Sequence, residues 1–412
     1  MKLARKIRLK PTKEQEELLR KSAGTARFIY NYALYKQKQS EKYIQEGVIR
    51  KEITQLKKTK EFEWLKEISN EVPKQAVKDL DKAFKNYFKK LVGYPKFKKK
   101  GKSKESFYTD AYCLEVKNKE VRIQKIGWVR TTEKLPKTKY YNTRVSFDGK
   151  YWYITVTIDT EIKLQELTKT VIGIDLGIEK LATLSTGKTY ININKTKKVK
   201  KLKKKIKRKQ RQISRKYEKN KQGKKYVKTK NIIKEEKCVR LIHRRITNIR
   251  ENHIHQITNE VVKTKPFCIV LEDLNVSGMM KNKHLSKAIQ EQNFYRFRQT
   301  LTYKAKLNGI KIVIADRFYP SSKTCSNCGS IKKNLKLSDR TYKCDECKFI
   351  VDRDLNASIN LSYLPCIPRE VKSAESYKNR SSLKDKTELN ETESLYSDVK
   401  HKYNNLIVVN NF

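Results

Sequence analysis

The sequence predicts an α+β protein with more than one domain, and three observations lead to this prediction. Residues 12–92 repeat apolar side chains at helical spacing, whereas residues 106–158 alternate apolar and polar side chains as strands do. After Thr170, short apolar runs end in single acids. Two Cys-x-x-Cys pairs near residue 335 indicate a small metal-bound module. A chain of 412 residues has room for roughly two or three domains.

The charge of the chain indicates its partner. The 97 Lys and Arg residues against 44 Asp and Glu residues give a net charge of +53, which a compact protein tolerates when a polyanion offsets the repulsion. Nucleic acid is the expected polyanion. A membrane surface would also attract this charge, but no run approaches the roughly 18 apolar residues of a spanning helix. The basic N-terminus has no apolar secretory core, so we expect the protein inside the cell.

The N-terminal part is expected to begin with a strand and continue as helices. Residues 3–10 alternate loosely and end at Pro11, which suits a short strand. Thr12 with Gln15 resembles a capping box, and it begins a helical pattern that reaches about Gln37. Two further helices are expected at residues 51–70 and 73–92, the second with Pro73 in its first turn.

Strands are expected from residue 106 to residue 158, after a segment broken by Gly93 and Gly101. The clearest feature is a hairpin around Asp148-Gly149, a primed-turn signal. The residues after this turn keep a period of two from Trp152 to Ile158.

The second half of the chain places three acids at the margins of apolar elements. Asp175 lies in the run 171–177, Glu272 ends the run 267–271, and Asp354 begins a helical pattern through Leu361. Further strands are expected at 181–184, 189–193 and 310–315. Three carboxylates at one core require cations or partners, and a divalent metal meets that requirement. Magnesium prefers such oxygen ligands.

Ordinary structural roles for these acids remain open at this point. Glu272 alone would more often be a solvated strand end or the cap of the next element. Asp354 alone would be a helix N-cap. The order of the three acids, on this strand pattern and in a chain this basic, favours the metal site.

Four of the eight cysteines have the spacing of a zinc site. Two Cys-x-x-Cys pairs, separated by fifteen residues, suit four thiolates around one structural zinc ion; they are Cys325, Cys328, Cys344 and Cys347. In a reducing compartment, zinc ligands plus scattered thiols are a better interpretation than disulfides.

The densest charge lies between the first and second acids. From Lys195 to Lys230, 20 of 36 residues are Lys or Arg, and an apolar stripe indicates an amphipathic helix rather than a tail. Gln222-Gly223 offers a break, and a second long helix follows to about residue 262. This basic hairpin would bind phosphates with an affinity that falls steeply with salt, although it could also be only a solvated charged face.

Four segments resemble the motifs of the TnpB family, insertion-sequence proteins related to type V CRISPR effectors. They are Ile174-Asp175-Leu176-Gly177, Leu271-Glu272-Asp273-Leu274-Asn275, the segment from Tyr319 to Gly329 with the first cysteine pair, and Asp352-Arg353-Asp354-Leu355-Asn356-Ala357. The start of the chain and Tyr94-Pro95-Lys96-Phe97 are also similar to the family, so the resemblance covers residues 1 to about 364. Two departures are Lys348, where the family usually has Gly, and Ser358, where a second Ala is common.

The resemblance implies an RNase H-like (RuvC) nuclease domain at residues 169–364, with a zinc ribbon inserted at 320–350 and the basic helical hairpin at 195–262. It implies a β-barrel formed by residues 1–11 and 96–168, with a helical recognition insert at 12–95. Residues 365–412 are rich in polar residues and read as a disordered tail.

The resemblance also implies a function, an RNA-guided DNA endonuclease of a prokaryotic transposon, acting in the cytoplasm at the nucleoid. Its guide RNA would come from the transposon end, and the N-terminal half would recognise a short motif beside the double-stranded DNA target. Asp175, Glu272 and Asp354 would be the catalytic acids that bind two Mg²⁺ ions, with Asp352 as the runner-up for the third acid. Two alternatives are a nuclease-silent RNA-guided DNA-binding protein and a transposase or DNA-binding accessory factor. The oligomeric state is open.

Overall fold

A computed structural model describes residues 1–162, 165–336 and 338–364 of the chain. The chain divides into two compact units. Unit 1 comprises Met1–Ile162 with Lys201–Asn248, and unit 2 comprises Lys163–Lys200 with the chain from Ile249 onward. The mixture of helices and antiparallel and parallel strands agrees with the predicted α+β multidomain class. The predicted tail, 365–412, lies outside the described residues.

Unit 1 contains one antiparallel sheet of seven strands in the order β2-β6-β7-β1-β5-β4-β3. The strands are β1 (Lys2–Lys10), β2 (Glu105–Tyr108), β3 (Glu115–Lys117), β4 (Glu120–Ile123), β5 (Gly127–Thr131), β6 (Tyr140–Phe147) and β7 (Trp152–Asp159). The predicted hairpin joins β6 to β7: the Asp148 amide bonds to the Tyr151 carbonyl, and Gly149 has a φ of 94°. Whether this sheet is the expected β-barrel stays a prediction.

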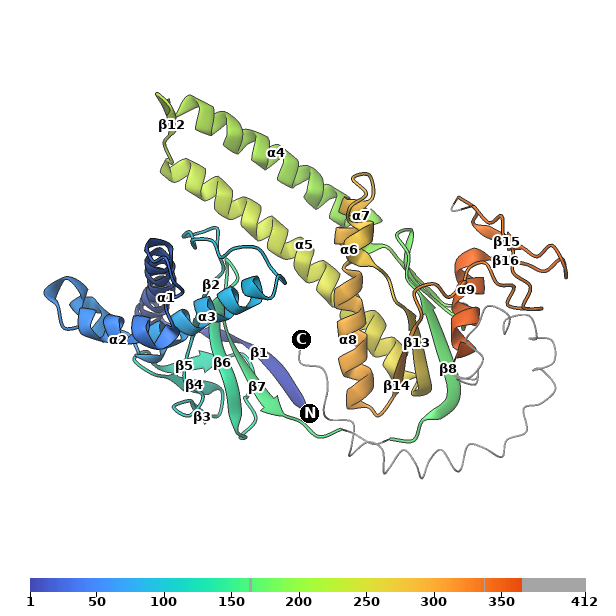
Figure 1. Cartoon of the computed structure of the whole chain (residues 1–412), viewed down its shortest axis with the longest axis horizontal. Helices are drawn as coiled ribbons and strands as arrows, with labels where there is room; N and C mark the ends of the chain where they lie inside the picture. Colours follow the sequence, from blue (N-terminus) through green and yellow to red (C-terminus); the bar gives the residue numbers. More distant parts are fainter. Residues whose placement is uncertain (163–164, 337, 365–412) are drawn as a thin grey trace. The chain divides into compact units, whose positions relative to one another are not determined.

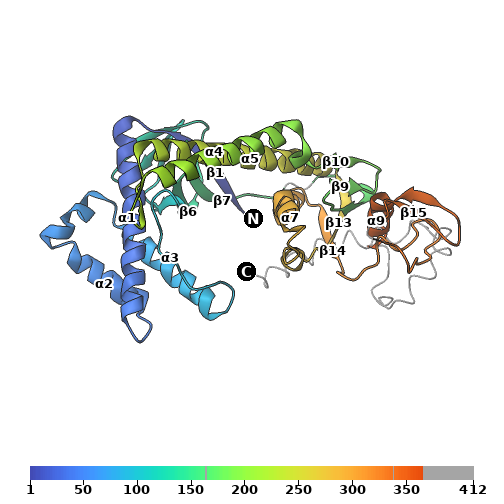
Figure 2. The same cartoon turned by 90° about the horizontal axis from the view of Figure 1, so that it is seen from above.

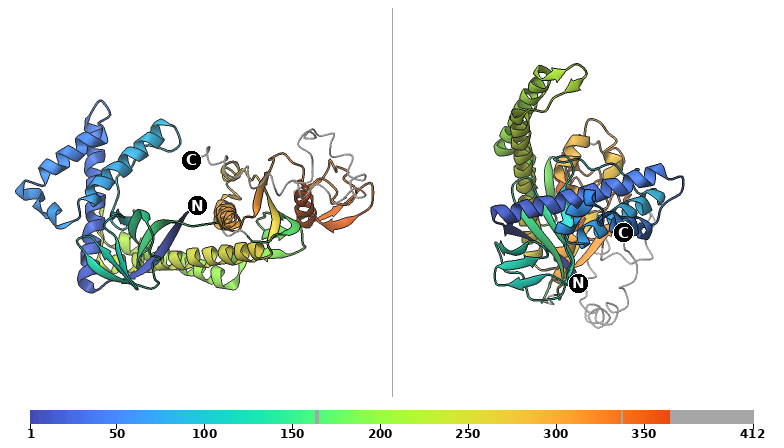
Figure 3. Two further views of the ribbon diagram at one scale, coloured as in Figure 1. Left: turned by 90° about the horizontal axis from the view of Figure 1, so that it is seen from below. Right: turned by 90° about the vertical axis from the view of Figure 1, so that its left-hand side faces the viewer.

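The helices of unit 1, which are blue in Figures 2 and 3, lie between β1 and β2 in the sequence. They are α1 (Lys13–Gln39), α2 (Glu46–Leu56), the 3₁₀ helix η1 (Lys60–Glu67) and α3 (Glu71–Phe88). The predicted capping box is present at the start of α1, because Thr12 and Gln15 bond reciprocally.

The single helix expected at residues 51–70 is wrong. Helix α2 ends at Leu56, residues 57–59 form a turn in which the Thr59 amide bonds to the Leu56 carbonyl, and the chain continues as η1. Apolar spacing alone could not reveal this change, because Leu65 is buried in the same core as Ile53 whether or not one helix joins them.

The predicted basic hairpin is formed by α4 (Lys197–Lys219) and α5 (Lys230–Lys263), joined through the short strands β11 (Lys221–Gln222) and β12 (Lys225–Tyr226). Gly223 supplies the turn with a φ of 56°. The two helices run side by side (Figures 1 and 2) and are linked by acids of α5: Glu235 pairs with Lys209, and Glu236 accepts a hydrogen bond of 2.8 Å from Tyr217.

Unit 2 is built on a sheet of five strands in the order β10-β9-β8-β13-β14. Strands β8 (Thr168–Asp175), β13 (Pro266–Glu272) and β14 (Lys311–Ala315) are parallel, and β9 (Lys180–Leu184) and β10 (Thr189–Ile191) are antiparallel to their neighbours. These are the strands expected from the sequence. The 3₁₀ helix η2 (Ile193–Lys195) follows β10.

Helices cover both faces of this sheet. The end of α5 and helix α8 (Phe294–Leu307) pack on one face, where Ile172, Ile174, Ile269 and Leu271 form a core with them. Helix α9 (Arg353–Ser362) packs on the opposite face beside β8 (Figure 1). The short helices α6 (Val276–Met279) and α7 (Ser286–Gln292) follow β13, and the strands β15 (Thr341–Lys343) and β16 (Ile350–Asp352) precede α9. Within the described ranges, no helix combines the length and apolarity that a membrane crossing demands.

Candidate functional site

The register between β8 and β13 brings two of the predicted acids to the same edge of the sheet. The strands are parallel, with Ile174 opposite Leu271, so Asp175 and Glu272 follow at the same level. Side chains alternate between faces with a period of two. Since Ile174 and Leu271 belong to the core on the α5 and α8 face, Asp175 and Glu272 point toward the α9 face.

Helix α9 carries the third acid to this face. Gly173 lies directly under the helix, and a Cβ atom there would come within 2.0 Å of the Ser358 carbonyl oxygen. Leu361 packs with Cys268 and Val270 on the same face. Asp354 is one helical turn before Ser358, and Asp175 is two residues beyond Gly173, so the packing brings both acids to one end of the α9 contact.

The charges that act on Asp175 include those of the other two predicted acids. Burial and the nearby carboxylates of Glu272 and Asp354 raise the pKa of Asp175 to about 8. Burial also raises the pKa of Glu272, although the positive charge of Arg353 opposes the increase. Oxygen donors that are costly to ionise together fit a hard divalent cation. In the described part of the chain, the four predicted cysteines are the group of donors already close enough together to hold one metal ion, and the three carboxylates are not.

Asp352, the alternative third acid, has a structural role. It is the N-cap of α9, where its carboxylate accepts hydrogen bonds from the Asp354 and Leu355 amides at 3.0 and 3.1 Å. It also pairs with Lys180 at 2.9 Å. The interpretation of Asp354 as the N-cap is therefore wrong, because the N-cap is Asp352, two residues earlier.

Glu272 is not the cap of the next helix either. Asn275 caps α6, accepting a hydrogen bond of 3.0 Å from the Gly278 amide. The neighbouring Asp273 pairs with Arg298 at 3.1 Å and Arg317 at 2.6 Å, and hydrogen bonding to Arg317 lowers the pKa of Asp273 despite partial burial. Glu272 is thus the acid of this pair that faces Asp175.

The four predicted cysteines meet in one group. Their sulfur atoms lie within 4.8 Å of one another, with Cys325 and Cys347 separated by 3.7 Å and Cys328 and Cys344 by 3.6 Å. Tetrahedral zinc with Zn–S bonds of about 2.3 Å separates its sulfur ligands by about 3.8 Å. The donor set and its spacing therefore fit one zinc ion.

The structure explains both departures from the family pattern. Lys348 follows the last cysteine with a φ of 57°, a left-handed conformation that Gly adopts without penalty and that the equivalent Gly329 adopts in the first pair. Ser358 is fully buried, and its hydroxyl donates a hydrogen bond of 2.8 Å to the Leu355 carbonyl. Each departure is accommodated locally.

Two asparagines connect the cysteine module to α9, a link that the sequence analysis missed. Asn356 accepts a hydrogen bond of 2.9 Å from the Ser326 amide and donates one of 2.7 Å to the Thr324 carbonyl. Asn360 donates to the carbonyls of Ser321 and Thr324 at 2.7 and 2.6 Å. Both asparagines are fully buried. Two amides four residues apart on an otherwise apolar helix face were the signal that could have revealed this link.

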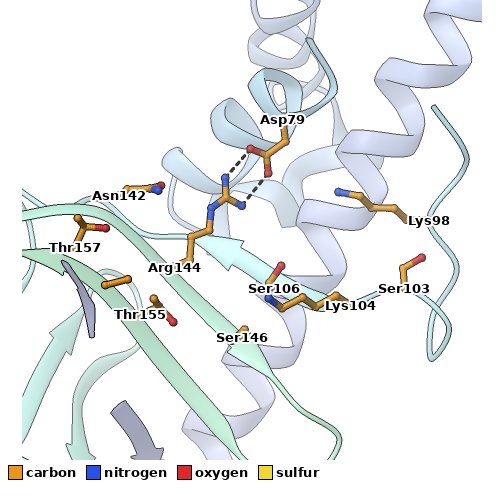
Figure 4. Close-up of a pocket in the computed structure, with 11 residues that line it drawn as sticks. Asp79, Lys98, Ser103, Lys104, Ser106, Asn142, Arg144, Ser146, Thr155 and Thr157 are labelled. Atoms are coloured by element: carbon orange, nitrogen blue, oxygen red, sulfur yellow. Dashed lines mark hydrogen bonds and ion pairs between the residues drawn. The ribbon is translucent and has the colours of Figure 1, made fainter. Parts of the chain in front are cut away.

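Unit 1 contains a polar cavity of about 440 Å³ between α3 and the sheet (Figure 4). Arg144 forms a bidentate pair with Asp79 at 2.6 and 2.9 Å. Lys98 also lines the cavity, and its ammonium lies 3.7 Å from the centre of the Tyr30 ring. Burial lowers the pKa of Lys98, although the charge of Asp79 opposes the decrease. None of these residues belongs to a motif that predicted a site from the sequence.

Three family models match the chain. A model described as "Probable transposase" matches residues 153–283, a model described as "Helix-turn-helix domain" matches 1–45, and a model described as "Cas12f1-like, TNB domain" matches 294–361. The structure has β1 and one continuous helix, α1, in the range of the second model. The third range includes all four cysteines and Asp354.

Curated proteins and solved structures are similar over most of the chain. InsQ of Escherichia coli (strain K12), named as an RNA-guided DNA endonuclease, is 31% identical over 377 residues that cover 86% of this chain and 90% of InsQ. A protein of Streptomyces pristinaespiralis, also named as an RNA-guided DNA endonuclease, is 32% identical over 373 residues, covering 88% and 89%. The cryo-EM structure of a Cas12f1–sgRNA–target DNA complex shares the fold with a TM-score of 0.54 at 15% identity, covering 85% of this chain and 83% of that chain. This chain therefore belongs to the TnpB family, the OrfB proteins of IS605-type elements.

Proposed function

We propose that this protein is a metal-dependent DNA endonuclease guided by an RNA. Two relatives that match most of its length are named as RNA-guided DNA endonucleases. The guide would be transcribed from the end of the transposon that encodes the protein, and pairing with it would supply sequence specificity. The N-terminal half would recognise a short motif beside the double-stranded target. The site of action in the host would be the nucleoid.

The observation that carries the proposal is the common face of Asp175, Glu272 and Asp354. We assign these three residues as the catalytic acids that hold magnesium. Three observations support this assignment: the register of β8 and β13, the packing of α9 on Gly173, and the effect of Glu272 and Asp354 on the pKa of Asp175. We also propose that the five-stranded sheet is an RNase H-like (RuvC) domain and that the seven-stranded sheet is a β-barrel.

Each residue of the site would have its own role in phosphodiester hydrolysis. When bound, magnesium would supply the Lewis-acid chemistry that activates the attacking water and stabilises the departing oxygen. Asp175 and Glu272 would supply oxygen donors from the rigid sheet, and Asp354 would supply one from α9. Arg353 lies close enough to lower the pKa of both sheet acids, so its charge would also offset that of an approaching phosphate.

We assign the four cysteines to one structural zinc ion. Zinc would hold the ribbon, and the ribbon would hold α9 through Asn356 and Asn360. In this arrangement zinc would not contact the reacting phosphate. Zinc would contribute to catalysis by fixing the position of Asp354.

The test begins with the RNA that copurifies with the protein. Sequencing should return one transcript from the end of the transposon, and the complex with Mg²⁺ should cleave a plasmid bearing the matched target. Asp175→Ala should keep the RNA and lose cleavage. Glu166→Ala removes an exposed acid of unit 2 that is outside the site, and it should cleave as the natural protein does.

Three outcomes would contradict the proposal. Undiminished cleavage by Asp175→Ala would refute the catalytic assignment. Guide-dependent DNA binding without cleavage by the natural protein would favour the nuclease-silent alternative. Activity without any RNA would favour a transposase or accessory factor.

A further inference from the structure

An exposed cluster of aromatic rings lies where α3 ends. Five rings are between 37% and 57% exposed, and a sixth, Phe84, is buried beneath them. We call the five exposed rings the aromatic patch: Tyr43, Tyr87, Phe88, Tyr94 and Phe97. Leu91 and Val92, which are 58% and 50% exposed, lie in the same segment. Single exposed apolar residues are ordinary, but a contiguous group of this kind marks an interaction surface.

The rings of the patch hold one another in place. The Phe84 ring centre lies 5.6 Å from that of Tyr43, 5.9 Å from that of Phe88 and 5.5 Å from that of Tyr94. Tyr87 packs edge-on against Tyr94 at 5.3 Å. These are favourable aromatic geometries, so the patch is formed before any partner binds. A preformed surface loses little conformational entropy on binding.

Lysines lie beside the patch and in the segments that carry it. The Lys38 ammonium lies 5.0 Å from the Phe97 ring centre and 5.9 Å from that of Tyr94. Five more exposed lysines lie in the segments that carry the rings: Lys42, Lys85, Lys89, Lys90 and Lys96. Two acids of the same region have cationic partners, since Asp81 pairs with Lys85 at 2.8 Å and Glu46 with Arg50 at 3.6 Å.

We propose that the aromatic patch binds unpaired bases of an RNA. Each base has a face that stacks on an aromatic ring, and the lysines are placed to contact the phosphates on either side. We infer RNA as the ligand because RNA loops and ends expose unstacked bases without the opening of a duplex. Duplex DNA keeps the faces of its bases covered. This inference rests on the proposed function, and it assigns a surface of unit 1 to the guide.

A second copy of this chain fits the patch less well than RNA does. Two such patches would bring their lysines together, and like charges at an interface oppose association. A neutral apolar partner would leave the lysines without counter-charges. A polyanion with unpaired bases matches both features of the surface, the aromatic rings and the lysines in the segments that carry them.

Binding of RNA to the full-length protein, stripped of copurified RNA and without Mg²⁺, tests the inference. The probes are a single-stranded RNA of about ten nucleotides and a blunt RNA duplex of the same sequence. Phe88→Ala should weaken binding of the single strand by about tenfold and change duplex binding little. Phe88→Tyr keeps a ring and should bind as the natural protein does. Tyr112→Ala removes a ring that is 89% exposed elsewhere in unit 1, and it should also bind normally.

The role of the lysines is tested separately, by the salt dependence of RNA affinity. Lys89→Gln and Lys96→Gln should each reduce the slope of log affinity against log salt for the single strand by about 0.7. Thermal unfolding of every variant shows whether the fold is kept. If Phe88→Ala is unstable, the salt slopes of the lysine variants and the binding of Phe88→Tyr still test the inference.

The outcomes separate this inference from the proposed function. If Phe88→Ala binds the single strand normally while the natural protein performs guided cleavage, the patch assignment alone is overturned. If Phe88→Ala instead converts a dimer to a monomer in sedimentation and leaves RNA affinity unchanged, the patch is a contact between copies. If single-strand binding depends on Phe88 but no guided cleavage occurs, the patch assignment stands and the proposed nuclease function fails.

Discussion

Gly173 and Ser358 are in such close contact that a methyl group on Gly173 would lie 2.0 Å from the Ser358 carbonyl oxygen and 2.6 Å from the Ser362 nitrogen. The backbone of α9 therefore rests directly on β8, without an intervening side chain. Asp175 and Asp354 are fixed by the same two elements. The distance between these acids thus depends on the absence of a side chain at Gly173.

Gly173→Ala should displace α9 and impair the acidic site. Inserting a methyl group into a packed contact of this kind costs about 1–3 kcal/mol of unfolding free energy. A shift of the helix by about 1 Å should reduce cleavage roughly a hundredfold, because catalytic groups lose their alignment. Thermal unfolding and plasmid cleavage measure the two effects.

The matched control is Gly47→Ala in α2, where a Cβ atom would meet nothing within 4 Å. It should stabilise unit 1 by roughly 0.5–1 kcal/mol, as Ala does within a helix, and leave cleavage unchanged. Full cleavage by Gly173→Ala would show that the α9 contact does not position Asp354.

Paired asparagine substitutions separate the two acids at the start of α9. Asn is as good an N-cap as Asp, so Asp352→Asn should keep the helix start and retain cleavage within about tenfold. Asp354→Asn should keep the stability of the fold and lose cleavage, because it removes an anionic oxygen from the site. Plasmid cleavage and thermal unfolding of both variants check this prediction. The reverse result, with cleavage lost only in Asp352→Asn, would make Asp352 the third acid.

The strands of the five-stranded sheet could be predicted from the sequence because each apolar run is bounded by a charged or turn residue. The run from Val171 to Gly177 is the clearest example: β8 begins three residues before it, at Thr168, and ends within it, at Asp175. The N-terminal capping box could also be predicted, since Thr12 and Gln15 form a local motif. Such features depend on neighbours along the chain, which is the information that a sequence displays directly.

Features that depend on distant segments could not be predicted from the sequence. Nothing near Gly173 in the sequence indicates that Ser358 will lie on it. The same is true of Asn360, whose partners are main-chain carbonyls about forty residues earlier, at Ser321 and Thr324. The aromatic patch was visible only as scattered rings, because its contacts join the ends of α1 and α3 with the segment around Tyr94.

Loss of zinc should impair cleavage without touching the acids. Cys344→Ser should release the ion and loosen the segment that holds Asn356 and Asn360, so α9 would lose its anchor. Metal analysis should find less zinc per chain, thermal unfolding should show a destabilised unit 2, and cleavage should slow. Cys113→Ser, which removes an exposed cysteine of unit 1, should keep both zinc and activity. An unchanged zinc content in Cys344→Ser would disprove the ligand assignment.

The link itself can be tested with Asn360→Leu, which keeps the zinc ligands. This variant removes the donor to the buried Ser321 carbonyl, at a cost of about 1–3 kcal/mol for a buried group left unsatisfied. The Thr324 carbonyl loses one of its two side-chain donors and keeps Asn356. Zinc content should stay normal while cleavage falls. Normal cleavage in a zinc-loaded Asn360→Leu would mean that the ribbon does not position α9.

Lys304 should make the stability of unit 2 depend on pH in the alkaline range. Its side chain is only 8% exposed between α8 and α5, where the ammonium donates to the His255 carbonyl at 2.8 Å and to the Thr258 hydroxyl at 2.7 Å. Burial lowers the pKa of Lys304 from 10.5 to about 8. Between these two values the unfolded chain holds a proton that the folded chain has released, so the free energy of unfolding should rise with pH. The rise from this group is at most about 1.4 kcal/mol per pH unit.

In Lys304→Met this contribution should vanish, whereas Lys306→Met, which changes an exposed lysine of the same helix, should keep it. Denaturant unfolding at several pH values between 8 and 10.5 measures the three slopes, and equal slopes for the natural protein and Lys304→Met would mean that Lys304 stays protonated throughout.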